Sequence, residues 1–197
     1  MTVPRSEYPR PQLVRKEWLC LNGEWQFEVD NAKSGMERGF YANDYTLNGK
    51  INVPFCPESR LSGIGNRDFI ASVWYKRAVD IPAEWRGKRI ILHFGAVDYH
   101  AIVFVNGTRV CEHRGGYTPF SADITEFLTW DGDMISLCAY DDVRAHNQPA
   151  GKQSAKYNSY GCFYTRTTGI WQTVWLEPVS ASHISGLKIT PDLDSSS

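Results

Sequence analysis

Short strand-like segments recur about every 8–12 residues, and almost no helix is predicted between them. In residues 23–30, Trp25, Phe27 and Val29 alternate with polar residues and therefore share one face of a strand. The strongest turn signal is the Asn106–Gly107 pair between two apolar stretches, because this dipeptide favours a tight β-hairpin. The one helix candidate, residues 121–132, covers about two turns and is better interpreted as a turn.

This pattern predicts an all-β jelly-roll or β-sandwich with little helix. A parallel β/α fold would need amphipathic helices of about ten or more residues between the strands, and the sequence has none. Tryptophans 25, 74, 171 and 175 fall on strand positions, so we expect core packing for them rather than ligand platforms. The strand at residues 169–177 carries apolar side chains on both faces, which predicts that both faces are covered.

The composition is that of a globular protein. The chain has 197 residues, 42% of them hydrophobic and 22% charged, which suits one domain with a short appendage. Its net charge of -1 argues against nucleic acid or an anionic membrane surface as a partner. The first 18 residues hold no apolar run typical of a secretory signal, and no segment is apolar enough to span a membrane, so we expect a cytoplasmic protein.

Motifs for catalysis, metal binding or cofactor binding are missing from the sequence. The five cysteines show no C-x-x-C spacing, which predicts reduced thiols, no metal site and no cofactor. A glycosidase needs two carboxylates across the scissile bond, but Asp141 and Asp142 are adjacent and should point to opposite faces of an extended chain. Asp98 and Asp123 lie at strand ends, where turn capping explains them. We therefore expect no catalytic residues in this chain.

Five segments, in a fixed order, resemble the N-terminal domain of glycoside hydrolase family 2, which includes β-galactosidases, β-glucuronidases and β-mannosidases. They are "LNGEWQFEVD", "VPFCPES", "VWYKRAVDIP", "ILHFGAVDYHAIVFVNGTRVCEHRGGYTPFSADIT" and "GIWQTVWLEP", and the resemblance spans about residues 18–178. The stretch "QPAGKQ" followed by "YTRTTGIWQTVWLE" is similar to a bacterial β-galactosidase-like branch of that family.

The resemblance implies a galactose-binding-domain-like jelly roll over residues 1–181, with residues 182–197 beginning a truncated immunoglobulin-like domain. In the family a TIM barrel follows and carries two catalytic glutamates of a retaining mechanism. Such a barrel needs about 250 residues, so we expect the catalytic residues to lie outside this chain. The implied partners are the remaining domains of the same polypeptide and, through the parent enzyme, a β-glycoside.

Two loops are the candidates for a substrate rim or a barrel-docking surface. The candidate residues are Phe163, Tyr164 and Arg166 in one loop and Asn66, Arg67 and Asp68 in the other. In the family, the loop before the Gly-Ile strand reaches toward the barrel, and some members place an acid six positions before that glycine; here that position is Phe163. The plainer interpretation is a loop whose arginine pairs with a carboxylate and whose aromatics plug the end of the sandwich. A free-standing carbohydrate-binding module and a protein-interaction sandwich are the alternative functions.

Overall fold

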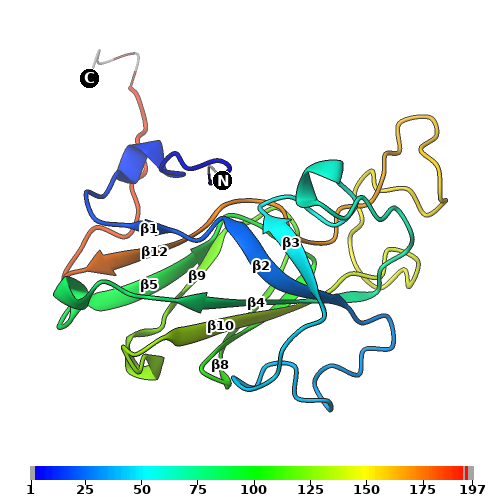
Figure 1. The fold of residues 1–197 in the computed structure, drawn as a ribbon. Helices are drawn as coiled ribbons and strands as arrows, with labels where there is room; N and C mark the ends of the chain where they lie inside the picture. The colour runs from blue at the N-terminus through cyan, green and yellow to red at the C-terminus, as the bar shows by residue number, and fades with distance from the viewer. Residues whose placement is uncertain (1–2, 193, 195–197) are drawn as a thin grey trace.

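The protein, described by a computed structural model over residues 3–192 and 194, is a sandwich of two antiparallel sheets (Figure 1). The last residues of the expected second-domain segment, 193 and 195–197, lie outside the described residues. The strands are β1 (Leu19–Cys20), β2 (Gly23–Val29), β3 (Gly49–Val53), β4 (Ser72–Val79), β5 (Arg89–Phe94), β6 (Val97–Asp98), β7 (His100–Val105), β8 (Thr108–Arg114), β9 (Phe120–Asp123), β10 (Asp133–Tyr140), β11 (Gly169–Ile170) and β12 (Val174–Val179). Helix is confined to four 3-10 turns in the described residues, η1 (Pro11–Leu13), η2 (Arg60–Ser62), η3 (Ala83–Trp85) and η4 (Thr125–Phe127).

Most strands that are neighbours in a sheet are not consecutive in the sequence, which is the crossover connectivity of a jelly roll. One sheet runs β3-β2-β4-β10-β7-β8, the other runs β1-β12-β5-β9, and β11 pairs with β6 in a short ribbon. The all-β jelly-roll prediction is confirmed. The helix candidate at residues 121–132 is the end of β9 followed by η4, where Asp123 Oδ1 accepts a hydrogen bond from the Thr125 backbone N–H at 3.1 Å. Asp123 is therefore the turn residue that the sequence predicted.

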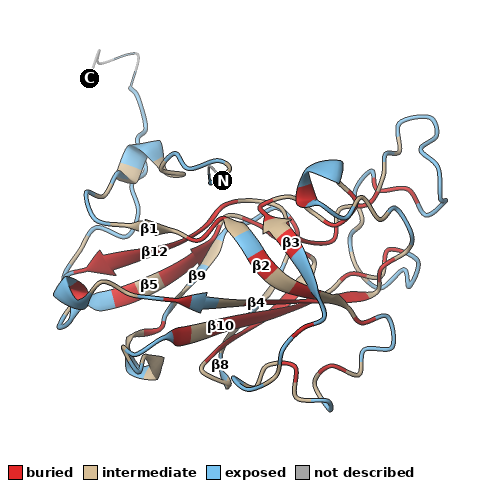
Figure 2. Cartoon of the chain, in the orientation of Figure 1, coloured by how far each residue is buried: buried red, intermediate tan, exposed pale blue. Residues whose placement is uncertain are grey.

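The main core lies between the two sheets, where one face of each strand is apolar (Figure 2). On β5, Ile90, Leu92 and Phe94 are at most 1% exposed and face the core, as their alternation predicts. The β7–β8 hairpin turns at Asn106 and Gly107, whose φ angles of 50° and 78° are those that the Asn-Gly pair tolerates. These local patterns fix the register, because a shift of one residue would expose the whole apolar face.

Both sheets are also covered over part of their outer faces. Residues 30–48 pack a second apolar cluster, with Phe40, Trp74 and Phe104, onto the outside of the six-stranded sheet. On the four-stranded sheet, the segment before β1 closes over β12 through Glu177, which is 1% exposed. The expectation of one strand over residues 169–177 was wrong, because β11 pairs with β6 and only β12 enters the four-stranded sheet. Every residue of β12 is buried, so the predicted cover on both faces holds for that part.

Glu177 holds the N-terminal segment against the sheet. Its carboxylate accepts hydrogen bonds from Tyr8 Oη at 2.5 Å, from Arg10 Nη2 at 2.9 Å and from Trp175 Nε1 at 2.7 Å. Burial by itself would raise the pKa of Glu177. The neighbouring His93 imidazole and the hydrogen bonds from Tyr8 and Trp175 have the larger, opposite effect, so the pKa of Glu177 lies well below its usual range. The carboxylate is therefore charged, and it ties together residues 162 or more positions apart.

Candidate functional site at the loop end of the sandwich

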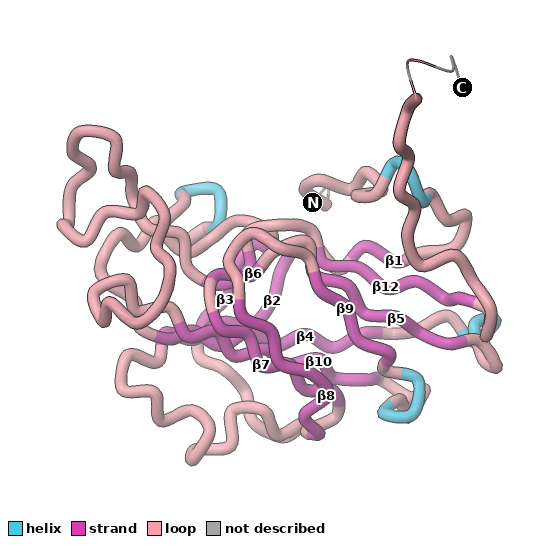
Figure 3. The backbone as a smooth tube through the Cα atoms, turned by 180° about the vertical axis from the view of Figure 1, so that it is seen from behind, coloured by secondary structure: helices cyan, strands magenta, loops and turns pink. Residues whose placement is uncertain are grey.

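Three connections gather at one end of the sandwich, which we call the loop end: residues 54–71, 115–119 and 141–168. Figures 1 and 3 show the loops that follow β3 and β10 bunched there, away from the end at which the C-terminal segment leaves. Both loops that hold the sequence-predicted candidates belong to this end. They meet because Tyr140, at the end of β10, pairs with Ser72, at the start of β4, so residues 141–168 leave the sheet where residues 54–71 return to it.

Arg166 is buried, with 3% of its surface exposed, and it fastens the loops to one another. Its guanidinium donates to the backbone carbonyls of Ser154 at 3.0 Å and Lys156 at 2.7 Å, and also to that of Arg67. The expected carboxylate partner is replaced by these carbonyls. Charged hydrogen bonds of this kind are strong, so Arg166 holds the backbone of both candidate loops in a fixed arrangement. Because it is buried, Arg166 shapes the surface of the loop end and adds almost no exposed area to it.

The second candidate loop, Asn66 to Asp68, lies directly against the first. Asn66 Oδ1 accepts from the Asp68 backbone N–H at 2.9 Å, which makes a tight polar turn. Arg67 is exposed, and its Nη2 reaches Thr165 Oγ1 at 3.4 Å. Asp68 is exposed as well. The structure thus brings together two sets of candidates that stand about a hundred residues apart in the sequence.

Aromatic side chains cover much of the loop end, and we call this group the aromatic patch. It consists of Tyr117, Tyr157, Tyr160, Phe163 and Tyr164. The four tyrosines are between 41% and 61% exposed, while Phe163 is half-buried and stacks on Tyr160 with ring centroids 5.1 Å apart. Tyr164 Oη lies 3.3 Å from Tyr117 Oη, so the loops at 115–119 and 141–168 meet in this patch. Phe163 and Tyr164 thus lie in the surface patch. Neither side chain carries a carboxylate.

Three buried carboxyl groups lie at the loop end, and no sequence pattern predicts that they are close together. Asp98, Asp141 and Glu58 are 3%, 2% and 8% exposed. Burial raises the pKa of Asp141 to about 8, and the negative charges of Asp98 and then Glu58 add to the effect. Burial likewise raises the pKa of Asp98 to about 6, and it raises the pKa of Glu58. Each group is thus more easily protonated than an ordinary carboxyl.

The explanation of Asp98 as a turn cap was wrong. Its Oδ2 accepts from Gln153 Nε2 at 2.7 Å, and the same Gln153 accepts from the Thr167 backbone N–H at 2.7 Å through its Oε1. Asp141 and Glu58 are both bonded to Thr168, at 3.2 Å in each case. The buried carboxyls therefore hold the loop of residues 141–168 onto the sandwich, and they lack the open access that a hydrolytic pair requires.

We also looked among the described residues for metal sites, membrane-spanning helices and disulfides. No group of three His, Cys, Asp or Glu among residues 3–192 and 194 has the arrangement to hold a metal ion. Within the same residues, no helix is long and apolar enough to cross a membrane. All five cysteines are free. What the loop end offers is a rigid, aromatic and polar surface.

Comparison with known proteins identifies the family of this chain. Residues 19–174 match the family described as glycosyl hydrolases family 2, sugar binding domain. The chain belongs to this family. Among curated relatives, the β-glucuronidase of Paenibacillus borealis is 35% identical over 201 aligned positions, which cover 96% of this chain. The β-glucuronidase of Felis catus is 35% identical over 161 positions and 73% of the chain, and a β-galactosidase of Thermoanaerobacter pseudethanolicus is 35% identical over 121 positions and 60% of the chain.

Solved structures agree with this family 2 domain in fold. The β-glucuronidase of Lactobacillus rhamnosus superposes with a TM-score of 0.66 and 26% identity, covering 83% of this chain and 28% of its own. The β-glucuronidase of Ruminococcus gnavus, in complex with D-glucuronic acid, gives a TM-score of 0.68 at 22% identity and covers 85% of this chain. The chain spans 34% of the Paenibacillus enzyme and 24% of the feline one. It is thus similar to about a third or less of each relative.

Proposed function

We propose that this chain is the non-catalytic N-terminal domain of a retaining β-glycosidase of the β-galactosidase or β-glucuronidase type, which docks on a TIM barrel and shapes the mouth of its active site. The aromatic patch is the observation that carries the proposal. Exposed tyrosines are enriched at protein interfaces because they combine a large apolar ring with a hydrogen-bonding hydroxyl. Four of them, each at least 41% exposed, gather on one end of this domain.

The order of the loop end also supports a docking role. Arg166 and the buried carboxyls Asp98 and Asp141 hold the loops by hydrogen bonds, so their backbone is organised before any partner arrives. Preorganisation lowers the entropy lost on association. The exposed candidates, Tyr164 and Arg67 among them, are therefore presented from a stiff base.

The partners in this proposal are the remaining domains of the parent polypeptide and a β-glycoside bound by the complete enzyme. Residues 182–192 fit the start of a following domain, because Ile184, Leu187 and Ile189 are 59%, 57% and 79% exposed and lie in an extended segment. In this proposal the following domain buries these three side chains. The location of the parent enzyme in the cytoplasm is part of the proposal.

Docking can be tested by separating the domains. The 197-residue chain and the remaining domains of the proposed parent would be expressed apart, mixed and analysed by size exclusion and by hydrolysis of nitrophenyl β-glycosides. We expect the chain alone to be inactive and the mixture to co-elute with restored activity. Tyr164→Ala should weaken co-elution, whereas Val14→Ala, which changes an exposed residue in the N-terminal segment, should leave it unchanged. Turnover by the chain alone, or co-elution insensitive to Tyr164→Ala, would contradict the proposal.

A free-standing carbohydrate-binding module is the second candidate, because stacked rings such as Tyr160 and Phe163 are also suited to sugar faces. In that case, neutral sugars should bind the isolated chain, and Tyr160→Ala should abolish the binding. A protein-interaction sandwich would bind neither sugar nor barrel.

A further inference from the structure

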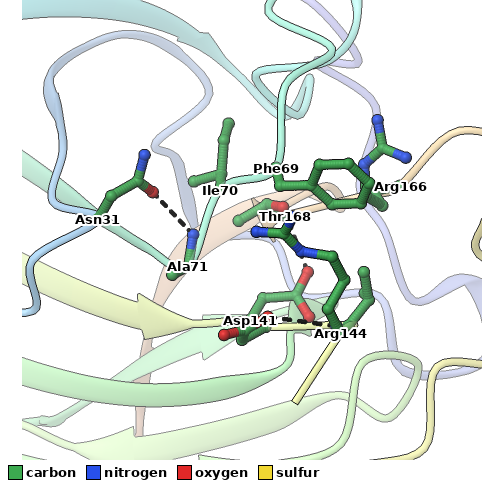
Figure 4. Close-up of a pocket in the computed structure, with 10 residues that line it drawn as sticks. Asn31, Phe69, Ile70, Ala71, Asp141, Arg144, Arg166 and Thr168 are labelled. Carbon is green, nitrogen blue, oxygen red and sulfur yellow. Dashed lines mark hydrogen bonds between the residues drawn. The ribbon is translucent and has the colours of Figure 1, made fainter. Parts of the chain in front are cut away.

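A separate pocket of about 270 Å³ opens beside the ends of β2 and β10, next to the start of β4 (Figure 4). Its walls include Asn31, Phe69, Asp142, Arg144 and Arg166. None of the five aromatic-patch residues lines it. The volume falls just below the range of about 300–1,000 Å³ that holds drug-sized ligands, so the pocket suits a single small molecule such as one sugar ring.

Phe69 and two arginines form a fixed wall of this pocket. The guanidinium carbons of Arg144 and Arg166 lie 4.0 Å and 4.2 Å from the centroid of the Phe69 ring. Such cation–π contacts restrain the guanidinium orientation. Arg166 uses its terminal nitrogens on backbone carbonyls, and its buried Nε has no hydrogen-bond partner. Its terminal nitrogens are thus occupied by carbonyl oxygens, and the charge of Glu58 favours its charged form against the effect of burial.

Arg144 differs from Arg166 because its charged group is free. It is exposed, and within residues 3–192 and 194 its guanidinium has no hydrogen bond and no ion pair. Asn31 Oδ1 accepts from the Ala71 backbone N–H at 2.9 Å, while its Nδ2 has no partner among the same residues. Asp142 Oδ1 accepts the Arg144 backbone N–H at 3.2 Å, which leaves Oδ2 as an acceptor. The pocket thus holds one free cation, one free amide donor and one free carboxylate oxygen.

The charge balance of the pocket favours an anion. Two arginines line it, against Asp141 and Asp142. Burial raises the pKa of Asp141 to about 8, so this carboxyl is mostly uncharged at neutral pH and does not offset an arginine. The exposed Arg144 guanidinium, stacked on Phe69, is therefore the charged group of the pocket that is available to an anion. A carboxylate matches the fork of a guanidinium in shape and charge.

We infer that this pocket is a second ligand site, which binds a sugar-sized carboxylate of the hexuronate class. The carboxylate accepts hydrogen bonds from the Arg144 guanidinium, and the ring hydroxyls pair with Asn31 Nδ2 and the Asp142 carboxylate. The inference goes beyond the proposed docking role, since it uses none of the aromatic patch.

The test is an NMR chemical-shift titration of the 197-residue chain with D-glucuronate, D-glucose and acetate at neutral pH. We expect glucuronate to bind with a Kd of about 1–10 mM or tighter, and glucose and acetate to bind about tenfold more weakly, because each lacks half of the recognised groups. Arg144→Gln should weaken glucuronate binding about tenfold. Arg86→Gln is the matched control, since Arg86 also stacks on an aromatic ring, Trp130 at 5.2 Å, and is exposed.

Circular dichroism and thermal melts would confirm that both variants stay folded. Three results would overturn the inference: no shifts with glucuronate, equal binding of glucose and glucuronate, or glucuronate binding unchanged by Arg144→Gln. Binding that is lost in Tyr160→Ala but kept in Arg144→Gln would also overturn it and would favour the aromatic patch as the sugar platform. Because docking is measured by co-elution, either proposal can fail without the other.

Discussion

Replacing Asp141 with asparagine should remove a large part of the pH dependence of folding stability. Asp141 is 2% exposed, and its carboxyl accepts from Gln148 Nε2 at 2.6 Å and from Thr168 Oγ1 at 3.2 Å. Burial, followed by the charges of Asp98 and Glu58, raises its pKa from 3.8 to about 8. Asparagine keeps the size and shape of the side chain but cannot titrate, so the substitution isolates the proton.

The sign of the change in stability with pH depends on whether the folded or the unfolded chain binds the Asp141 proton. Between the unfolded pKa of 3.8 and the folded pKa of about 8, the folded chain binds the Asp141 proton and the unfolded chain does not. The stabilising contribution is therefore complete below the unfolded pKa and is lost as pH rises through the folded value. One proton changes the free energy of unfolding by about 1.4 kcal/mol per pH unit, which gives a loss on the order of 2–3 kcal/mol between pH 6 and pH 9. Asp98, with a pKa raised to about 6, acts mainly below this window and is present in both proteins.

Urea denaturation at a series of pH values measures this difference. Wild-type stability should fall by about 2–3 kcal/mol more than that of Asp141→Asn between pH 6 and pH 9. Asp68→Asn, which changes an exposed carboxylate in the neighbouring loop, should follow the wild-type curve. Parallel curves for wild type and Asp141→Asn, or wild-type stability that rises with pH in this window, would refute the reasoning.

Three further substitutions test the contacts that hold the domain together. Glu177→Gln should cost about 3 kcal/mol in urea denaturation, because it weakens a buried ionic network, whereas Glu24→Gln, whose partner lies in solvent, should change little. Gly169→Ala should cost about 3 kcal/mol, since the residue has a φ of 73° and an added Cβ would lie 2.3 Å from Tyr75 Oη; a loss below about 1 kcal/mol would argue that the loop relaxes freely. Arg166→Met should expose residues 154–165 to limited proteolysis, and an unchanged cleavage pattern would show that the arginine does not hold this loop.

The buried carboxyls show why spacing in the sequence does not reveal which acidic residues lie close together. Asp98 is bonded to a side chain 55 positions away, and Thr168 reaches Glu58 across 110 positions. No local spacing records such contacts. The sequence also placed Arg166 among surface candidates, because an arginine in a polar loop is usually exposed; only the enclosing carbonyls show why it is buried.

The sequence by itself determined most of the strands, the hairpin and the family, because these depend on neighbouring residues. Alternation along β5, the Asn106–Gly107 turn and the ordered segments of family 2 are all read within a few residues of one another. The tertiary structure alone decided what the loop end is. It set Arg166 against Arg67, 99 positions away, gathered the exposed tyrosines, and stacked the Arg144 guanidinium on Phe69. Long-range contacts of this kind form only when folding brings distant parts of the chain together. The residues that make them follow no repeating pattern in the sequence.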